Sequence, residues 1–231
     1  MLEIIPVEGL GEVTQDSDIA DLIMQSIEVM DFDVLVVTQK IVSKQEGLII
    51  KLNPSNPEGH KRQIVEDESV AILRRRGDLV ISETHHGFVC ANAGVDLSNV
   101  PSGTVALLPK NPDLSAKKIM QNIKKKSGKS VGVIISDTFG RPWRRGLCDV
   151  AIGVSGIAPV VDWKGKNDAN GREMQVTEVC IADELASAAE LVMPKDSGIP
   201  VAIVRGVDKS WFQSPGLAKE IIRNPNEDLF R

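Results

Sequence analysis

The sequence predicts an α+β fold in which mixed, largely antiparallel sheets carry flanking helices. Short apolar segments of strand-like composition are interspersed with amphipathic segments of helical periodicity, and their order is not a regular strand-helix-strand repeat. Hydrophobic residues make up 42% and charged residues 26% of the 231 residues, so the chain can bury a substantial core. No internal repeat or long linker is present, and the length suits one large domain or two small ones.

The elements are predicted from periodicity and from the residues at which each periodic segment stops. In the first third, a strand, a helix and a strand are predicted at residues 3–7, 19–29 and 33–38. Asp16 and Ser17 are the N-cap candidates of that helix. A second helix is predicted over residues 58–76, because charged and apolar residues alternate there at helical spacing and Gly77 follows as a C-cap.

The remaining two thirds contain more strands than helices. Strands are predicted at residues 79–83, 87–91, 104–109, 131–137, 149–156, 173–182 and 199–206. Helices are predicted at residues 115–128, 183–193 and 216–224. The strands at 149–156 and 173–182 flank a polar turn, so we expect them to pair in antiparallel fashion.

Composition excludes several classes of function. The net charge is −5 and the pI about 5.3, whereas a nucleic-acid-binding face usually needs a basic excess. No apolar run is long enough to span a membrane, and the first residues lack the pattern of a signal peptide, so a cytoplasmic protein is expected. The three cysteines lack metal-ligand spacing and no G-x-S-x-G motif is present, which disfavours a zinc site and a serine nucleophile.

One segment, "VGVIISDTFGRPWRRG" at residues 131–146, suggests phosphate chemistry. Its apolar strand ends on Asp137 and Thr138, whose hard oxygens suit Mg²⁺ or Mn²⁺. Arg141, Arg144 and Arg145 follow, and guanidinium groups form paired hydrogen bonds with phosphates and carboxylates. The same residues could also form a solvated loop with arginines covering an exposed tryptophan.

Two further loops carry polar residues next to apolar segments. In "VTQKIVSKQEG", Lys44 can reach a phosphate as a point charge, although most lysines in such positions are simply solvated. In "NAGVDLSNV", Asp96 and Asn99 flank a turn, where such residues often bond only their own backbone. Neither a Walker A motif nor a G-x-G-x-x-G motif after a strand is present, which disfavours the two commonest nucleotide folds.

These motifs together resemble one family. "GLGEV", "VTQKIVSKQEG", "NAGVDLSNV", "ISDTFGRPWRRG", "DWKGKNDANGREMQVTEVCIADELA" and "GIPVAIVRG" occur in the order seen in coenzyme F420-0:γ-glutamyl ligases, including the N-terminal half of the mycobacterial two-domain form. The resemblance covers nearly the whole chain. It implies a ligase domain over residues 1–231, which could consist of two intertwined subdomains, without the C-terminal nitroreductase-like domain of the two-domain form.

The resemblance implies GTP-dependent addition of L-glutamate to the lactyl carboxylate of coenzyme F420-0, a deazaflavin, followed by further γ-linked glutamates. GTP would convert the carboxylate to an acyl phosphate, which the amine of glutamate then attacks. Two divalent ions, Mg²⁺ or Mn²⁺, would neutralise charge on the phosphates, and K⁺ is a further candidate cation. The expected partners are GTP, coenzyme F420-0, L-glutamate and a second copy of the chain in an intertwined homodimer.

The resemblance also assigns roles to individual residues. It implies that Asp96, Asp137 and Thr138 bind the divalent ions. Arg141 is expected to clamp phosphate because of its distance from the Asp-Thr pair, and it completes the expected catalytic set with Asp96 and Asp137. The expected nucleotide-binding residues are Leu10, Gly11, Glu12, Val13, Gln39, Lys44 and Asn99. The family's glycine-rich stretch near residues 193–200 is replaced here by Pro194 and Lys195, so no metal ligand is expected there.

Two other functions remain open on the sequence. A non-catalytic nucleotide-binding module could regulate a partner, and it would not turn over GTP when coenzyme precursor and glutamate are both present. A metal-dependent phosphatase acting on a nucleotide would instead release phosphate without glutamate. The sequence shows no obvious nucleophile or general base for the phosphatase.

Overall fold

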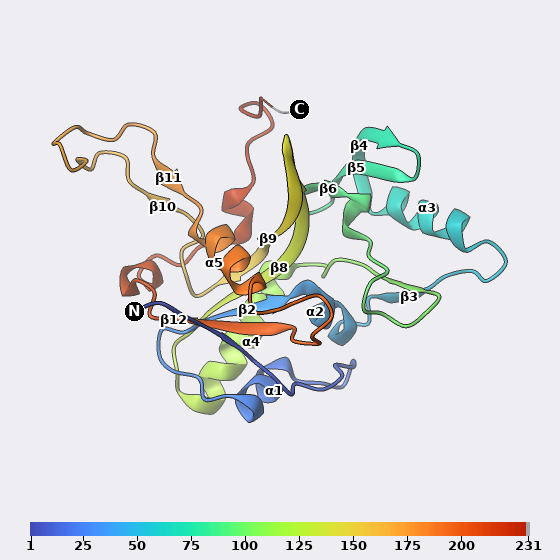
Figure 1. The fold of residues 1–231 in the computed structure, drawn as a ribbon, viewed down its shortest axis with the longest axis horizontal. Helices are drawn as coiled ribbons and strands as arrows, with labels where there is room; N and C mark the ends of the chain where they lie inside the picture. Colours follow the sequence, from blue (N-terminus) through green and yellow to red (C-terminus); the bar gives the residue numbers. More distant parts are fainter. Residues whose placement is uncertain (230–231) are drawn as a thin grey trace.

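The computed structural model describes residues 1–229 and confirms an α+β fold (Figure 1). At its centre lies a five-stranded sheet with the strand order β1-β12-β2-β8-β9. Its strands are β1 (Glu3–Pro6), β12 (Val201–Arg205), β2 (Val34–Thr38), β8 (Gly132–Arg141) and β9 (Arg144–Ser155). Only β2 and β8 are parallel neighbours, and the other adjacent pairs are antiparallel.

Helices cover both faces of this sheet. Helices α1 (Ile19–Ser26) and α4 (Pro112–Ser127) pack on one face, where Leu35 and Val37 of β2 join their core. Helix α5 (Ile181–Glu190) packs on the opposite face against Val34 and Val36. Because β2 and β8 are buried on both faces, their sequences are continuous apolar runs rather than alternating patterns.

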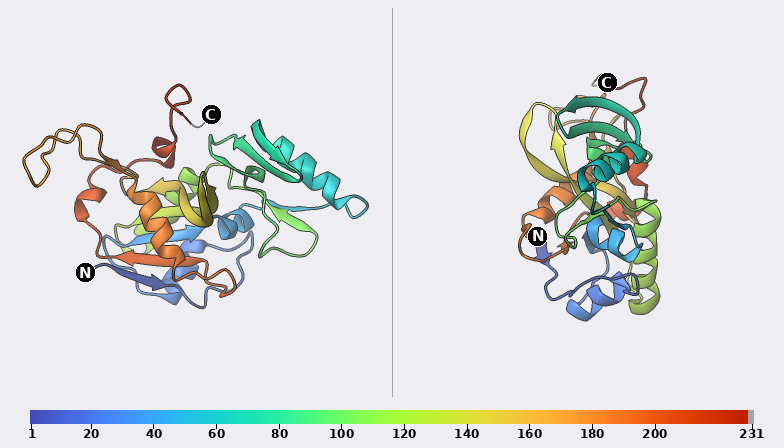
Figure 2. Two further views of the ribbon diagram at one scale, coloured as in Figure 1. Left: turned by 45° about the horizontal axis from the view of Figure 1, so that its top comes forward. Right: turned by 90° about the vertical axis from the view of Figure 1, so that its right-hand side faces the viewer.

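Smaller elements extend from the centre in two directions (Figures 1 and 2). At one end stand α3 (Pro57–Asp67), the three-stranded sheet β4 (Ser69–Arg76), β5 (Leu79–Thr84) and β6 (Val89–Ala91), and the pair β3 (Ile49–Lys51) and β7 (Thr104–Ala106). At the other end is an arm that contains the short pair β10 (Val161–Asp162) and β11 (Glu178–Val179). The remaining helical segments are α2 (Gln39–Gln45) and three 3₁₀ turns, Asn92–Gly94, Lys209–Phe212 and Ala218–Ile221.

The predicted helix over residues 58–76 is wrong in its second half. Helix α3 ends at Asp67, and residues 69–76 form strand β4, which pairs with β5. Gly77 adopts a φ of 59° in the turn between these strands instead of capping a helix. The apolar residues at 69–76 have a spacing that fits both a helix and a bulged strand. Pairing with β5 decides in favour of the strand.

Other predicted elements need smaller corrections. The predicted strand at 149–156 pairs with β8 and not with 173–182, which contains only the two residues of β11 before α5 begins. The predicted terminal helix at 216–224 is a single 3₁₀ turn. The N-cap of α1 is Asp18, whose carboxylate accepts hydrogen bonds from the backbone of Ala20 and Asp21. The sequence analysis did not predict strands β3 and β10 or the helix α2, which carries Lys44.

The prediction that the apolar strand ends at Asp137 is also wrong. Strand β8 continues to Arg141, turns at Pro142 and Trp143, and returns as β9. Its neighbour β2 stops earlier, because Thr38 pairs with Ser136 and α2 follows at once. The β8-β9 hairpin therefore leaves the central sheet at the Asp-Thr pair, where the polar residues begin.

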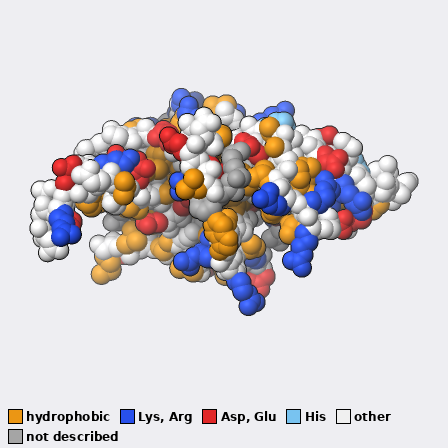
Figure 3. Space-filling view, turned by 90° about the horizontal axis from the view of Figure 1, so that it is seen from above, with side chains coloured by type: hydrophobic (Ala, Val, Ile, Leu, Met, Phe, Trp, Pro, Cys, Tyr) orange, Lys and Arg blue, Asp and Glu red, His pale blue; other side chains and the backbone are white. Residues whose placement is uncertain are grey.

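The surface is mixed in character. On the face seen in Figure 3, Lys and Arg side chains lie in separate groups with acidic and hydrophobic side chains between them. Across residues 1–229, no helix combines the length and the apolar character needed to cross a membrane.

Candidate active site

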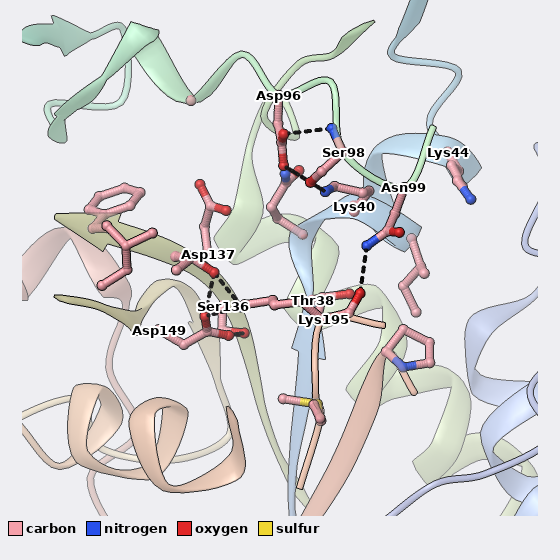
Figure 4. Close-up of a pocket in the computed structure, with 18 of the residues that line it drawn as sticks. Thr38, Lys40, Lys44, Asp96, Ser98, Asn99, Ser136, Asp137, Asp149 and Lys195 are labelled. Atoms are coloured by element: carbon pink, nitrogen blue, oxygen red, sulfur yellow. Dashed lines mark hydrogen bonds and ion pairs between the residues drawn. The ribbon is translucent and has the colours of Figure 1, made fainter. Parts of the chain in front are cut away.

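A cavity of about 880 Å³ lies where the β8-β9 hairpin leaves the central sheet. Segments far apart in the sequence line it: the N-terminal loop, α2, the stretch from β6 through the 3₁₀ turn Asn92–Gly94 and the loop after it, the hairpin, and the loop before β12. Figure 4 shows labelled side chains from the start of α2, the loop after Asn92–Gly94, the hairpin and the loop before β12 around the cavity. Its volume is in the usual range for small-molecule sites.

The hairpin contributes the acidic floor of the cavity. Asp149 on β9 is 2% exposed and accepts hydrogen bonds from Ser136 Oγ at 2.9 Å and Thr138 Oγ1 at 2.6 Å. Asp137 lies between these two β8 residues, so its side chain points to the other face of the hairpin. Side-chain oxygens therefore project from both faces of the hairpin at neighbouring positions of β8.

A strained loop brings a third carboxylate to the opposite wall. Asn92, Ala93 and Gly94 adopt successive positive φ angles of 51°, 52° and 73°, a conformation that costs energy in non-glycine residues. Two residues later, Asp96 forms an ion pair of 2.6 Å with Lys40 Nζ. Hydrogen bonds from Ser98 also hold the Asp96 carboxylate in place.

The environments of Asp137 and Asp96 shift their pKa values in opposite directions. Burial, reinforced by the negative charges of Asp96 and Asp149, raises the pKa of Asp137 to about 7. Burial also opposes ionisation of Asp96, but hydrogen bonds from Lys40 and Ser98 outweigh it and lower the Asp96 pKa. The cavity thus disfavours the ionised form of Asp137, and a carboxyl group with such a raised pKa is typical of functional sites.

The N-terminal loop and α2 form a second wall. Lys44 Nζ makes an ion pair of 2.6 Å with Glu12 Oε1, which ties the loop to the helix. Gln39, 2% exposed, accepts a hydrogen bond from Ser43 through Oε1, while its Nε2 has no partner among the described residues. A buried amide donor without a partner is costly unless a ligand supplies an acceptor.

The loop before β12 forms a further wall of the cavity. Lys195 Nζ lies 2.7 Å from Thr138 Oγ1, 3.2 Å from Asp149 Oδ1 and 2.8 Å from Glu190 Oε1. The backbone carbonyl of Lys195 accepts a hydrogen bond from Asn99 Nδ2 at 3.2 Å. One residue thus connects the acidic floor to the loop that carries Asp96 and Asn99.

Comparisons with known proteins identify the family. The family model for F420-0:Gamma-glutamyl ligase matches residues 9–206, most of the chain. The chain belongs to this family. Coenzyme F420:L-glutamate ligases similar to it include that of Methanothermobacter thermautotrophicus, 42% identical over 249 residues with 100% of this chain and 99% of the relative covered. The corresponding protein of Methanocaldococcus jannaschii is 46% identical over 228 residues, covering 93% of this chain and 90% of the relative.

The cavity of this F420-0:γ-glutamyl ligase family member gathers most of the residues singled out in the sequence. Those lining it are Gly11, Glu12, Val13, Gln39, Lys44, Asp96, Asn99, Asp137 and Thr138. Leu10 is instead packed in the hydrophobic core, 5% exposed. Arg141 lies at the tip of the hairpin outside the cavity lining, and its Nη2 donates a hydrogen bond to the carbonyl of Arg145 at 3.4 Å.

The cavity residues that the sequence analysis missed include Lys40, Ser98, Ser136 and Asp149. Recognising α2 would have revealed Lys40, because Lys40 and Lys44 are four residues apart and share one face of the helix. Asp149 could have been noticed as an acid that enters an otherwise apolar strand, "DVAIGVSG". No pattern in the sequence marks Ser136, which is selected by its place beside Asp149.

The donor set fits a hard divalent cation by its chemistry. Asp96, Asp137, Thr138 and Asp149 offer side-chain oxygens, the donors that such cations prefer. Burial, together with the charges of the two neighbouring aspartates, raises the pKa of Asp137, and a bound cation would favour its ionised form. Within residues 1–229, however, no three acidic, histidine or cysteine side chains already converge as a complete set of ligands. Lys40 and Lys195 instead contact the carboxylates of Asp96 and Asp149.

Proposed function

We propose that the chain is a GTP-dependent ligase that joins L-glutamate to coenzyme F420-0 and then adds further γ-linked glutamates. The observation that supports this most is the convergence of Asp96, Asp137 and Thr138 with Lys44 and Asn99 around one cavity, in a member of a γ-glutamyl ligase family. Relatives that align with this chain over nearly their whole length carry the name coenzyme F420:L-glutamate ligase.

The proposed reaction has two steps. First, an oxygen of the lactyl carboxylate attacks the γ-phosphorus of GTP, and GDP leaves with the electron pair of the broken bond. Second, the amine nitrogen of glutamate attacks the resulting acyl carbon, phosphate leaves, and the nitrogen loses a proton to complete the amide. Activation as an acyl phosphate is needed because a carboxylate is a poor acylating agent.

The residues of the cavity divide this work. Lys44 contributes a compact positive charge toward the phosphates, and the unpartnered Nε2 of Gln39 donates a hydrogen bond to the nucleotide. Asp96, Asp137 and Thr138 would hold Mg²⁺ or Mn²⁺, with Asp149 orienting Thr138 through its hydrogen bond. The bound ions would neutralise negative charge on the phosphate oxygens during transfer. Arg141 would reach the phosphates only after movement of the hairpin tip or from a second copy of the chain.

A product assay tests the proposal directly. Coenzyme F420-0, GTP, Mn²⁺ and L-glutamate are incubated with the protein, and mass spectrometry is used to count the glutamates added. We expect amide product and one GDP per amide bond, with less product when ATP replaces GTP. Phosphate release without glutamate would instead indicate a phosphatase, and no turnover with all substrates present would indicate a non-catalytic nucleotide-binding module.

The proposal includes a homodimer in the cytoplasm. Light scattering should give twice the mass of the 25.0 kDa chain. A monomer mass at assay concentration, with full activity, would contradict the homodimer.

A further inference from the structure

A second cavity, of about 410 Å³, lies beside the first and has no role in the site described so far. It is formed between the β4-β5-β6 sheet, the outer part of the β8-β9 hairpin and the segment that follows the last 3₁₀ turn. Its lining is mainly apolar and includes Ile81, Phe88, Val89, Phe139 and Val150.

The second cavity adjoins the acidic floor of the first. Phe139 lines both cavities and therefore stands at their common wall. Val150, which lines only the second cavity, pairs directly with Asp137 in the hairpin register. Residues paired in this way lie on the same face of a hairpin, so the second cavity reaches the side of β8 from which Asp137 projects.

The aromatic residues of the second cavity suit a flat ring system. The rings of Phe88 and Phe139 meet edge to face with centroids 6.3 Å apart, and His86 stacks on Phe88 at 5.8 Å. Aromatic and branched aliphatic walls bind flat, apolar ligands through large contact areas. Two arginines and two acidic residues add polar groups to this lining: Arg74, Arg223, Asp183 and Asp228.

The two cavities differ in the charge that they offer. The first cavity is lined by Lys40, Lys44 and Lys195 and by four acidic residues, whereas the described lining of the second cavity is mainly apolar and its two arginines are matched by two acidic residues. A metal-phosphate group is therefore better accommodated among the charges of the first cavity, and a flat aromatic group against the apolar walls of the second.

We propose that the second cavity binds the flat aromatic end of the acceptor, the deazaflavin ring, while the acceptor's tail passes Phe139 and presents its carboxylate beside Asp137. This assignment rests on the proposed ligase function, because it takes the deazaflavin as the acceptor. It separates the site into a nucleotide compartment and an acceptor compartment that meet at Phe139.

Filling the cavity tests the assignment. Val89→Trp places a large side chain at a lining position on β6 that is 38% exposed. Leu79→Trp is the matched control, since Leu79 lies on the adjacent strand β5, is 46% exposed and lines neither cavity. The deazaflavin precursor alone is titrated into each protein, with its own fluorescence as the signal. The thermal midpoint of each variant checks that it is folded, and the smaller Val89→Phe substitution replaces Val89→Trp if the latter does not fold.

The expected result is a loss of affinity for the precursor of at least about tenfold in Val89→Trp, with affinity for GTP unchanged within about twofold in both variants. Equal affinity of Val89→Trp and wild type for the precursor would overturn the assignment, as would a wild type that does not bind the precursor. The product assay reports separately on the proposed function. If the protein binds the precursor in this cavity but forms no amide, the binding-site assignment stands and the proposed ligase function is refuted.

Discussion

Replacing Asp137 by asparagine should abolish ligation and at the same time stabilise the free protein. Asparagine has nearly the same shape as aspartate but cannot carry the negative charge that a divalent cation needs. Losing that ligand should cost several kcal/mol of transition-state stabilisation, or more than about a thousandfold in turnover. The gain in stability has a different origin, the cost of ionising Asp137 inside the cavity.

The size of this gain follows from the pKa of Asp137. The pKa of about 7 in the folded protein exceeds the ordinary aspartate pKa of 3.8, so the unfolded chain releases this proton more readily. The folded state therefore loses stability as pH rises above about 4, and the loss is complete above about pH 7. At pH 8 the cost is about 4 kcal/mol, and at pH 5 it is about 2 kcal/mol. Because Asp137→Asn does not incur this cost, its thermal midpoint should rise by about 10 °C at pH 8 and by about half as much at pH 5.

Two measurements on the same preparations check this reasoning. Thermal unfolding is recorded without metal at pH 5 and pH 8 for wild type, Asp137→Asn and the exposed control Asp16→Asn, and turnover is measured at saturating Mn²⁺. The control should behave as wild type in both measurements. Near-normal turnover of Asp137→Asn would refute the metal assignment, and an equal shift of its midpoint at both pH values would refute the electrostatic explanation of stability.

Three further substitutions test other parts of the structure. Lys44→Ala should weaken GTP binding by about tenfold or more in titration calorimetry without changing the dependence on Mn²⁺, and Lys44→Arg should restore little of the affinity. Unchanged GTP affinity in Lys44→Ala would mean that Lys44 only pairs with Glu12. Gln39→Leu should change stability by less than about 1 kcal/mol, because Nε2 has no partner to lose and Ser43 Oγ, which donates to Gln39 Oε1, also donates to the carbonyl of Leu107. The same substitution should reduce GTP affinity severalfold in the same titration. Ile152→Ala, at a 1% exposed position of β9, should lower the free energy of unfolding by about 2–5 kcal/mol in urea, whereas Leu191→Ala, at an 80% exposed position, should have almost no effect.

Local periodicity predicted the core of the fold well and its periphery poorly. Strands β2, β8 and β12 contain continuous apolar runs that burial on both faces explains, and each strand begins within two residues of its predicted start. Residues 69–76 were assigned to the wrong element type, because their pairing partner β5 is a tertiary feature. The extension of β8 to Arg141 likewise depends on its pairing with β9 and not on its own composition.

The candidate site was predicted to the extent that its residues lie in recognisable motifs. Asp96, Asp137 and Lys44 stood out because each follows an apolar segment. Lys40 and Asp149 did not, since their importance comes from contacts with residues 56 and 11 positions away, which only the folded chain brings together. Arg141 stood out in the sequence but lies outside the cavity, because the hairpin extends it away from the floor.

The ammonium groups that contact the cavity carboxylates affect how ligands are expected to bind. Lys40 on Asp96 and Lys195 on Asp149 act as internal counterions. When a metal-nucleotide complex binds, its cation would contact the two carboxylates and its phosphates would contact the two lysines. Each ion pair that breaks would then be replaced by new ones, and the net charge of the site would change little. Affinity for the complex should accordingly depend only weakly on ionic strength, whereas the nucleotide or the cation added alone would have to break an ion pair without replacing it.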